Sequence, residues 1–167
     1  MPQATLTYLG LGANLGDPIE QMIHTYSHLS RWEHGLSLRR SQFYLSPPMG
    51  YSDQPDFINC VVEMYTSATA LELLDFTSGI ETNMGRLRDP SNQNAPRLLD
   101  IDILLFGDQA LQTPNLTIPH PRMTQRLFVL LPLLELIADH DSAQFKKYRT
   151  IANSLLEENQ SIELLRV

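Results

Sequence analysis

The chain is poor in features on which whole classes of protein depend. Its 167 residues contain one cysteine, Cys60, so no disulfide can form within the chain. We expect a small buried apolar side chain there, and a reducing compartment. No apolar run approaches the ~18 residues of a membrane-spanning helix, and the first residues lack a secretory pattern. We therefore expect a cytoplasmic protein with a single domain over residues 1–167.

Lysine is absent before Lys146. A P-loop needs a lysine after its second glycine, and a protein kinase needs a lysine in an early strand, so both classes are excluded. If the protein handles a nucleotide, arginines and metal ions must neutralise the phosphates.

Basic residues are outnumbered, 12 against 19 acidic residues, for a net charge of −7. This balance argues against general nucleic-acid binding. Five of the twelve basic residues nevertheless fall within about forty residues of each other: Arg86, Arg88, Arg97, Arg122 and Arg126. Because arginine binds phosphate through a planar fork of N–H groups, the cluster favours a small phosphorylated ligand.

Two carboxylates stand inside an apolar run, in the segment Arg97-Leu-Leu-Asp100-Ile-Asp102-Ile-Leu-Leu. Side chains of a strand alternate between faces, so Asp100 and Asp102 share one face with Cβ atoms roughly 6–7 Å apart. Like charges at ~6 Å repel by about 3 kcal/mol at an effective dielectric of ~20. A shared proton, a nearby arginine or divalent metal ions would each offset this cost.

The apolar neighbours of the pair suggest a central strand rather than the polar face of an edge strand. Two metal ions could join the carboxylates to phosphate oxygens and support an in-line displacement. Magnesium suits hard oxygen ligands, and the chain offers no cysteine–histidine set for zinc.

Hydrophobic periodicity and turn residues predict the other elements. A helix opens at Asp17-Pro18, with Ile19, Met22, Ile23, Tyr26 and Leu29 at helical spacing. The remaining predicted helices cover 69–84, about 123–138 and 148–158, and the predicted strands cover 4–13, 36–46, 57–66, 98–106 and 162–166. The order β-α-β-β-α-β predicts an α+β, ferredoxin-like antiparallel sheet with helices packed on it and a C-terminal helical extension.

Three further sequence features indicate a binding site less specifically than the aspartate pair does. Gly10-Leu-Gly12-Ala-Asn-Leu-Gly16 follows a strand, but its spacing is not that of a dinucleotide fingerprint, which favours a tight turn with close backbone packing. His120 lies between two prolines and could donate to a phosphate, or be merely structural. Asn59 and Phe57 share a strand face, and an amide beside an aromatic ring suits a flat heterocycle.

Taken together, the segments resemble the 6-hydroxymethyl-7,8-dihydropterin pyrophosphokinase family of folate biosynthesis. The resemblance covers residues 8 to about 138. The joint occurrence of its segments is specific to the family, although no single segment is. The segments are Leu-Gly-Ala-Asn-Leu-Gly-Asp (11–17), Ser-Pro-Pro-Met-Gly (46–50), Asp-Gln-Pro-Asp-Phe-Ile-Asn (53–59), Gly85-Arg86-Leu-Arg88, Pro96-Arg97-Leu-Leu-Asp100-Ile-Asp102 and Leu-Thr-Ile-Pro-His-Pro-Arg-Met (116–123).

The resemblance implies transfer of pyrophosphate from ATP to the pterin hydroxymethyl group, with AMP as the second product. It assigns Asp100 and Asp102 to two Mg²⁺ ions, and Arg86 and Arg97 to the moving phosphates. It assigns to ATP binding, besides those arginines, Leu74, Glu81, Arg88, Ile103, Leu116, Thr117, His120 and Arg126. It assigns to the pterin Ser46, Pro47, Met49, Phe57, Asn59 and Phe128.

One segment departs from the family pattern. Asn94-Ala95-Pro96-Arg97 stands where the family often has Trp-Gly-Pro-Arg, so the aromatic cover of the closing loop is missing. We expect an ATP- and Mg²⁺-dependent pyrophosphokinase that acts as a monomer on small molecules, without nucleic-acid or membrane partners. Two alternatives stay open: another two-metal nucleotide enzyme, such as a cyclase or polymerase palm, and a catalytically weak or silent pterin-binding paralogue.

Overall fold

The computed structural model describes residues 3–50, 52–85, 96 and 98–167. Its main sheet has six strands: β1 (Thr5–Ala13), β2 (Gly35–Arg40), β3 (Phe43–Ser46), β4 (Phe57–Thr66), β5 (Asp100–Phe106) and β8 (Glu163–Leu165). The order is β5-β1-β4-β3-β8, with β2 also pairing with β4, and every pairing is antiparallel. A separate hairpin joins β6 (Leu111–Gln112) to β7 (Thr117–Ile118).

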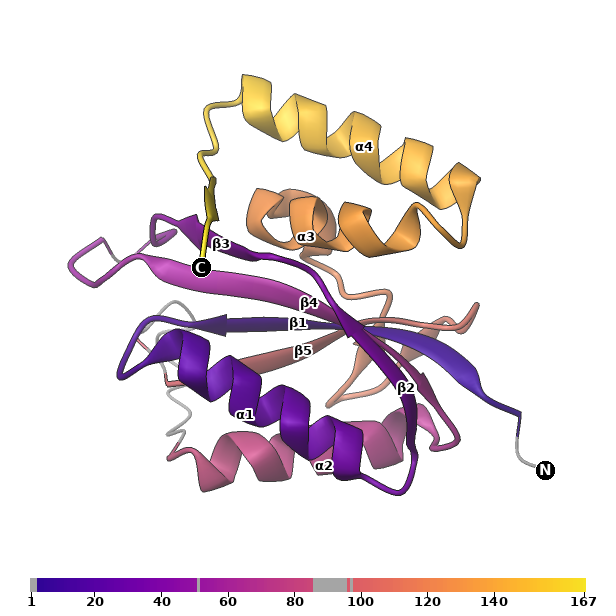
Figure 1. Ribbon diagram of the computed structural model, residues 1–167. Helices are drawn as coiled ribbons and strands as arrows, with labels where there is room; N and C mark the ends of the chain where they lie inside the picture. Colours follow the sequence, from indigo (N-terminus) through magenta and orange to yellow (C-terminus); the bar gives the residue numbers. More distant parts are fainter. Residues whose placement is uncertain (1–2, 51, 86–95, 97) are drawn as a thin grey trace.

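Helices cover both faces of this sheet (Figure 1). The helices α1 (Pro18–Arg31) and α2 (Ala70–Asn83) lie side by side on one face, while α3 (Leu127–Ile137) and α4 (Ser142–Glu157) stack on the other. The short 3₁₀ turn η1 (Met123–Gln125) leads into α3. The predicted ferredoxin-like order and its C-terminal helical extension are confirmed. None of the helices within the described ranges combines the length and apolar character needed to cross a membrane.

Helix starts follow from local chemistry. Asp17 caps α1, because its Oδ1 accepts from the Glu20 backbone N–H at 3.1 Å and Pro18 occupies the first helical position. Thr69 and Glu72 form a reciprocal capping box at the start of α2, with bonds of 3.2 and 2.7 Å. These side chains bind backbone groups that a helix end leaves unpaired.

Alternation along the strands divides the core into two layers. Leu9, Leu11 and Ala13 of β1 pack toward α1 and α2, whereas Tyr8 packs toward α3 and α4. Eight of the eleven residues of α3 are buried, because this helix lies between the sheet and α4. Its nearly uniform apolar sequence follows from that position.

Some predicted boundaries differ from the observed ones. The strand predicted over 36–46 is two strands, β2 and β3, interrupted at Ser41 and Gln42. The last helix begins at Ser142 rather than near 148. In α1, Ile23 is 53% exposed, and Thr25 is buried beside Met22 and Leu29 instead.

The strand that carries Asp100 and Asp102 is not central, and that prediction is wrong. Among the strands of the described ranges, β5 pairs with β1 alone and therefore forms an edge. Its apolar run has another cause: Ile101 and Ile103 pack in the α1–α2 layer, whereas Leu104 and Leu105 pack in the α3–α4 layer. Both faces are covered, so an edge strand is as apolar as a central one.

Candidate active site

A pocket of about 350 Å³ lies on the α3 side of the sheet, where β1, β4 and β5 meet the loop after β3 and the start of α3. It is lined by residues far apart in sequence. Nine of those predicted to bind metal or substrates are among them: Ser46, Pro47, Met49, Phe57, Asn59, Asp100, Asp102, Arg126 and Phe128.

The floor of this pocket is made by two glycines of β1. In the sheet register Gly12 lies between Asn59 of β4 and Asp100 of β5, and Gly10 lies between Val61 and Asp102. A Cβ atom on Gly12 would lie 3.2 Å from the Asn59 Oδ1, closer than an ordinary contact. The glycines therefore leave open space between the amide on one side and the carboxylates on the other.

Asp100 and Asp102 both line the pocket, so the prediction that they share one sheet face is confirmed. Both residues are half-buried, and the Asp102 side chain is 33% exposed. Two adjacent carboxylates at an open pocket are suitable ligands for a hard divalent cation. Within the described ranges no group of three or more histidine, cysteine, aspartate or glutamate side chains gathers for a metal, so a bound ion would take further oxygens from water or substrate.

His120 reaches the same carboxylates from the edge of the sheet. Its backbone N–H donates to the Leu104 carbonyl at 2.9 Å, and its Nδ1 accepts from the Arg122 backbone N–H at 3.1 Å. The proton of the neutral ring therefore resides on Nε2, which lies 3.8 Å from the Asp102 Oδ1. Burial first, and then the positive charge of Arg126, lower the pKa of His120 to about 4, although Asp100 opposes them. At neutral pH the ring is an uncharged N–H donor rather than an ion-pair partner.

Two arginines of the segment before α3, Arg122 and Arg126, line the pocket. Arg122 is exposed, whereas Arg126 is half-buried with its guanidinium 5.7 Å from the centre of the Phe128 ring. The 3₁₀ turn η1 separates the two arginines in sequence, and both line the same pocket as the carboxylate pair. An anion held there would meet guanidinium groups on one side and the neutral His120 N–H on the other.

A buried amide forms the other wall. The Asn59 Nδ2 donates to the Ser46 Oγ at 2.8 Å, and both residues are at most 4% exposed. Phe57 and Phe128 line the same pocket from β4 and α3. An amide with aromatic rings nearby can recognise a flat heterocycle by hydrogen bonding and stacking.

Two loops near this wall are tied together by Asn14, which is buried. Its Nδ2 donates to the Gln54 Oε1 at 2.8 Å and to the Pro55 carbonyl at 2.9 Å. The loop after β1 and the loop before β4 are thereby held in a fixed relation. The loop before β4 leads directly to Phe57 and Asn59, so Asn14 helps to position that wall.

The remaining predicted site residues lie elsewhere. Leu74, Ile103 and Leu116 pack in the α1–α2 core layer, Glu81 is buried in α2, and Thr117 belongs to β7. Their assignment to the nucleotide stays a prediction. Arg86, Arg88 and Arg97, together with Asn94 and Ala95, lie outside the described residues.

Several pocket residues have no role in the sequence-based prediction. Gly10 and Gly12 lie within β1, in agreement with the strand predicted over 4–13, and Gly16 has the turn conformation, with φ of +67°. Their i, i+2 spacing, the same as that of the two aspartates, is the signal for a shared face. Gln125 and Val129 also line the pocket, and nothing in their sequence context indicates it.

The fold and the pocket define a class: an α+β, ferredoxin-like domain with paired carboxylates, arginines and an amide–aromatic wall around one pocket. A dinucleotide-binding fold is excluded, because both neighbours of β1 run antiparallel to it.

Comparison with known proteins agrees with this class and narrows it. The model of the family described as 7,8-dihydro-6-hydroxymethylpterin-pyrophosphokinase (HPPK) matches residues 8–138. The chain therefore belongs to this family, and the sequence-based resemblance is confirmed.

Curated relatives carry the corresponding name. The 2-amino-4-hydroxy-6-hydroxymethyldihydropteridine pyrophosphokinase of Haemophilus influenzae is 40% identical over 132 residues, which are 79% of this chain and 81% of that protein. The Pseudomonas aeruginosa protein of the same name is 42% identical over 132 residues, 79% of this chain and 80% of that protein.

Among solved structures, wild-type Plasmodium falciparum HPPK-DHPS with pterin and p-hydroxybenzoate matches with a TM-score of 0.69 at 16% identity. The match covers 100% of this chain and 47% of that one, so the chain spans under half of the bifunctional protein. At this identity the likeness concerns the fold. With the family established, this chain is a pyrophosphokinase, and the comparisons give no support to a cyclase, a polymerase palm or a silent paralogue.

Proposed function

We propose that this chain transfers the pyrophosphoryl group of ATP to the hydroxymethyl group of 6-hydroxymethyl-7,8-dihydropterin, with Mg²⁺ held by Asp100 and Asp102. The hydroxyl oxygen attacks the β-phosphorus of ATP, the bond from that phosphorus to the oxygen that bridges to the α-phosphorus breaks, and AMP leaves. The hydroxyl proton is lost, and the product is the pterin diphosphate. The observation that carries the proposal is the single pocket in which the carboxylate pair faces the Asn59 wall across a glycine floor.

The amide–aromatic wall is the proposed pterin site. Ser46 fixes the Asn59 amide, so the pterin ring would meet a preset hydrogen-bonding edge. Phe57 and Phe128 would stack on the ring, while Pro47 and Met49 border it from the loop after β3. A flat ring bound there would point its hydroxymethyl group across Gly12 toward Asp100.

The opposite side of the pocket is the proposed phosphate site. Arg126 and the neutral His120 Nε2–H would donate to phosphate oxygens, and Asp102 and Asp100 would hold the metal ions. When bound, magnesium supplies positive charge that neutralises the phosphates of the nucleotide. Asp100 is the carboxylate best placed to accept the hydroxyl proton, because Gly12 alone separates it from Asn59 in the sheet register.

Other residues enter the proposal from the family resemblance. Arg86 and Arg97 would engage the transferring group, Arg88 would add a phosphate contact, and Leu74, Glu81, Ile103, Leu116 and Thr117 would border the nucleotide. Action as a monomer in the cytoplasm stays a prediction, and size-exclusion chromatography with light scattering tests the oligomeric state.

The test is a product assay with each reactant omitted in turn. Protein, ATP, Mg²⁺ and 6-hydroxymethyl-7,8-dihydropterin are incubated together, and nucleotides are separated by ion-exchange chromatography. We expect AMP and pterin diphosphate in equal amounts, and neither product without the pterin or without Mg²⁺.

Each alternative gives a different result in the same assay. Release of pyrophosphate without pterin would identify a cyclase-like enzyme. Pterin binding at micromolar concentration without AMP formation would identify a silent binding protein. Either outcome would contradict the proposed transfer.

A further inference from the structure

A pair of histidines lies on α1, on the side of the sheet opposite to α3 and the pocket (Figure 1). His24 and His28 are one turn apart on α1, and both are exposed. Both line a groove of about 370 Å³ that runs between α1 and α2. Neither histidine is among the residues that the proposed transfer uses, and neither lines the pocket that contains the carboxylate pair.

The two rings converge through the same ring atom. Their Nε2 atoms lie 3.0 Å apart, with ring centroids 4.5 Å apart and the ring planes at 79° to each other. One neutral ring must donate its proton to the other for this contact to exist. Two solvent-exposed imidazoles therefore already hold the spacing that a shared cation would require.

The spacing also favours a particular coordination angle. Metal–nitrogen bonds of about 2.0–2.1 Å drawn from nitrogens 3.0 Å apart meet at roughly 90–97°. That is the angle between neighbouring ligands in tetragonal or octahedral geometry, which Cu²⁺ and Ni²⁺ adopt. Tetrahedral zinc would need the nitrogens about 3.3 Å apart.

The facing side of the groove leaves room for the other ligands of such an ion. Asp75, Gly79 and Asn83 are spaced one turn apart along α2, and all three line the groove. A Cβ atom at Gly79 would have no neighbour within 4 Å, so the middle of the groove is open. The Asp75 carboxylate adds negative charge nearby, while water can fill the remaining coordination positions.

We propose that His24 and His28 form a two-imidazole chelate for a divalent transition-metal ion, with Cu²⁺ bound most tightly, then Ni²⁺. No third histidine, cysteine or carboxylate completes a cluster within the part of the chain that the structure describes, so the protein supplies two ligands. On binding, the ring that carries its proton on Nε2 shifts it to Nδ1, so both Nε2 lone pairs face the metal and no net proton is released. Mg²⁺, which prefers oxygen, is excluded.

The chain carries its own reporter for this site. Trp32 is its single tryptophan, one turn beyond His28, and it stacks on Phe76 with ring centroids 4.3 Å apart. Phe76 lines the groove. Bound Cu²⁺ quenches nearby indole fluorescence, so titration of the full chain with CuCl₂ measures binding without any assay of catalysis.

The test compares the unmodified chain with His24→Asn, His28→Asn and His34→Asn. His34 lies 5.2 Å from Trp32 by ring centroids but outside the pair, so its variant is the matched control. We expect quenching of Trp32 that saturates in a single phase, an apparent Kd for this quenching raised at least about tenfold by His24→Asn or His28→Asn, and an unchanged Kd in His34→Asn. Electron paramagnetic resonance of the 1:1 complex should report two equatorial nitrogens.

Three outcomes would overturn the proposal: equal Cu²⁺ affinity in the chain and in His24→Asn, loss of binding only in His34→Asn, or a single coordinated nitrogen. MgCl₂ at the same concentrations should leave the fluorescence unchanged, and quenching by it would also contradict the proposal. Circular dichroism of each variant confirms the fold. The result does not depend on the proposed transfer, because the readout contains no pterin or ATP.

Discussion

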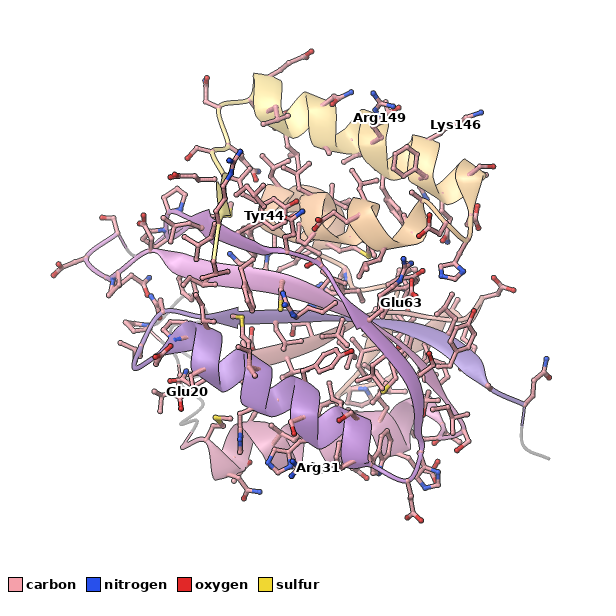
Figure 2. All side chains as sticks on the ribbon, in the orientation of Figure 1. Glu20, Arg31, Tyr44, Glu63, Lys146 and Arg149 are labelled. Atoms are coloured by element: carbon pink, nitrogen blue, oxygen red, sulfur yellow. The ribbon has the colours of Figure 1, made fainter. Side chains whose placement is uncertain are left out.

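The α3-facing side of β4 carries polar residues at both ends, and the two ends differ in what surrounds them. Asn59 lies at the open end, beside Gly12 and the aspartate pair. Glu63 lies four residues further along, beneath the turn between α3 and α4 (Figure 2). Val61, between them, packs in the α3–α4 layer.

At the closed end the protein itself satisfies the carboxylate. Glu63 accepts from the Arg39 Nε and Nη2 at 3.0 and 3.1 Å and from the His140 Nε2 at 3.1 Å. Arg39 also donates to Asp139 at 2.6 Å and to the Leu136 carbonyl at 2.8 Å. Although burial raises the pKa of Glu63, these hydrogen bonds, led by that from Arg39, outweigh it and hold the pKa below its ordinary value.

At the open end, carboxylates face a pocket with a glycine floor and an uncharged histidine. The same sheet face therefore has one end built for stability and one built for binding. The comparison teaches that a charge buried beneath other elements contributes to the fold, whereas charges that line an open pocket lie where a ligand can reach them. Exchanging or removing residues at each end should separate the two roles.

The largest effect is expected from Asp102→Ala. We expect the rate of pyrophosphate transfer to fall by about 1,000-fold or more, because the metal ligand is lost. The melting temperature should stay the same or rise slightly, since repulsion within the carboxylate pair disappears. Steady-state kinetics and thermal unfolding measure the two quantities on one preparation. The matched control is Asp108→Ala, which removes an exposed carboxylate beyond the same strand and should change neither.

At the closed end we expect a loss of stability with little loss of activity. Glu63→Gln should lower the free energy of unfolding by about 2–3 kcal/mol, less than for a fully buried pair because the Arg39 side chain is 39% exposed. Urea unfolding measures this loss, and kcat of the folded enzyme should change less than about threefold.

A second variant keeps that prediction testable. Changing both partners, Glu63→Leu with Arg39→Met, should destabilise less than Glu63→Gln alone, since no charge is left facing an apolar group. A larger kcat loss in Glu63→Gln than in Asp102→Ala would reverse the comparison of the two ends.

The two ends should also lose stability in different pH ranges. The pKa of His120 is about 4 in the folded chain against 6.5 as its ordinary value, so the unfolded chain takes up a proton that the folded chain does not. Above pH 6.5 the neutral ring does not reduce the free energy of unfolding. As the pH falls from 6.5 toward 4, the free energy of unfolding decreases by on the order of 3 kcal/mol. Glu63, with a lowered pKa, loses its contribution only below its ordinary pKa of 4.5.

Urea unfolding at a series of pH values measures both steps. His120→Gln should remove part of the decline between pH 6.5 and 4, and Glu63→Gln should flatten the decline below 4.5. An unchanged slope between pH 6.5 and 4 in His120→Gln would show that the ring is not held neutral.

The smallest effect is expected at the pocket floor. Gly12→Ala places a methyl group 3.2 Å from the Asn59 Oδ1 and should raise KM for the pterin by about tenfold. Gly10→Ala meets the Leu104 side chain at 3.4 Å, an ordinary contact, and should raise it less than about threefold. Initial rates with varied pterin measure both, and equal effects would contradict the role given to Gly12.

The open end was largely predictable from the sequence, because its signals are local. The i, i+2 spacing predicts that Asp100 and Asp102 share one face, and the strand predicted over 57–66 is confirmed as β4. The cap at Asp17 follows from Pro18 and Glu20 directly after it. The order of elements then fixed the ferredoxin-like arrangement.

The closed end could not be predicted, because its partners come together only in the fold. Arg39, Glu63 and Asp139 are 24 to 100 residues apart, and each alone resembles a surface charge. The break at Ser41 has a similar cause: its Oγ accepts from the Val61 backbone N–H at 2.9 Å across the sheet. The edge position of β5 was misjudged because helix layers, rather than neighbouring strands, cover its faces.

The most direct measurement is calorimetric titration of a non-hydrolysable ATP analogue into the chain with and without Mg²⁺. The same titrations are then made on the double variant Asp100→Asn, Asp102→Asn. We predict that Mg²⁺ tightens nucleotide binding to the unmodified chain by at least about 100-fold and leaves the double variant unaffected. A double variant that keeps the full Mg²⁺ dependence would contradict the account.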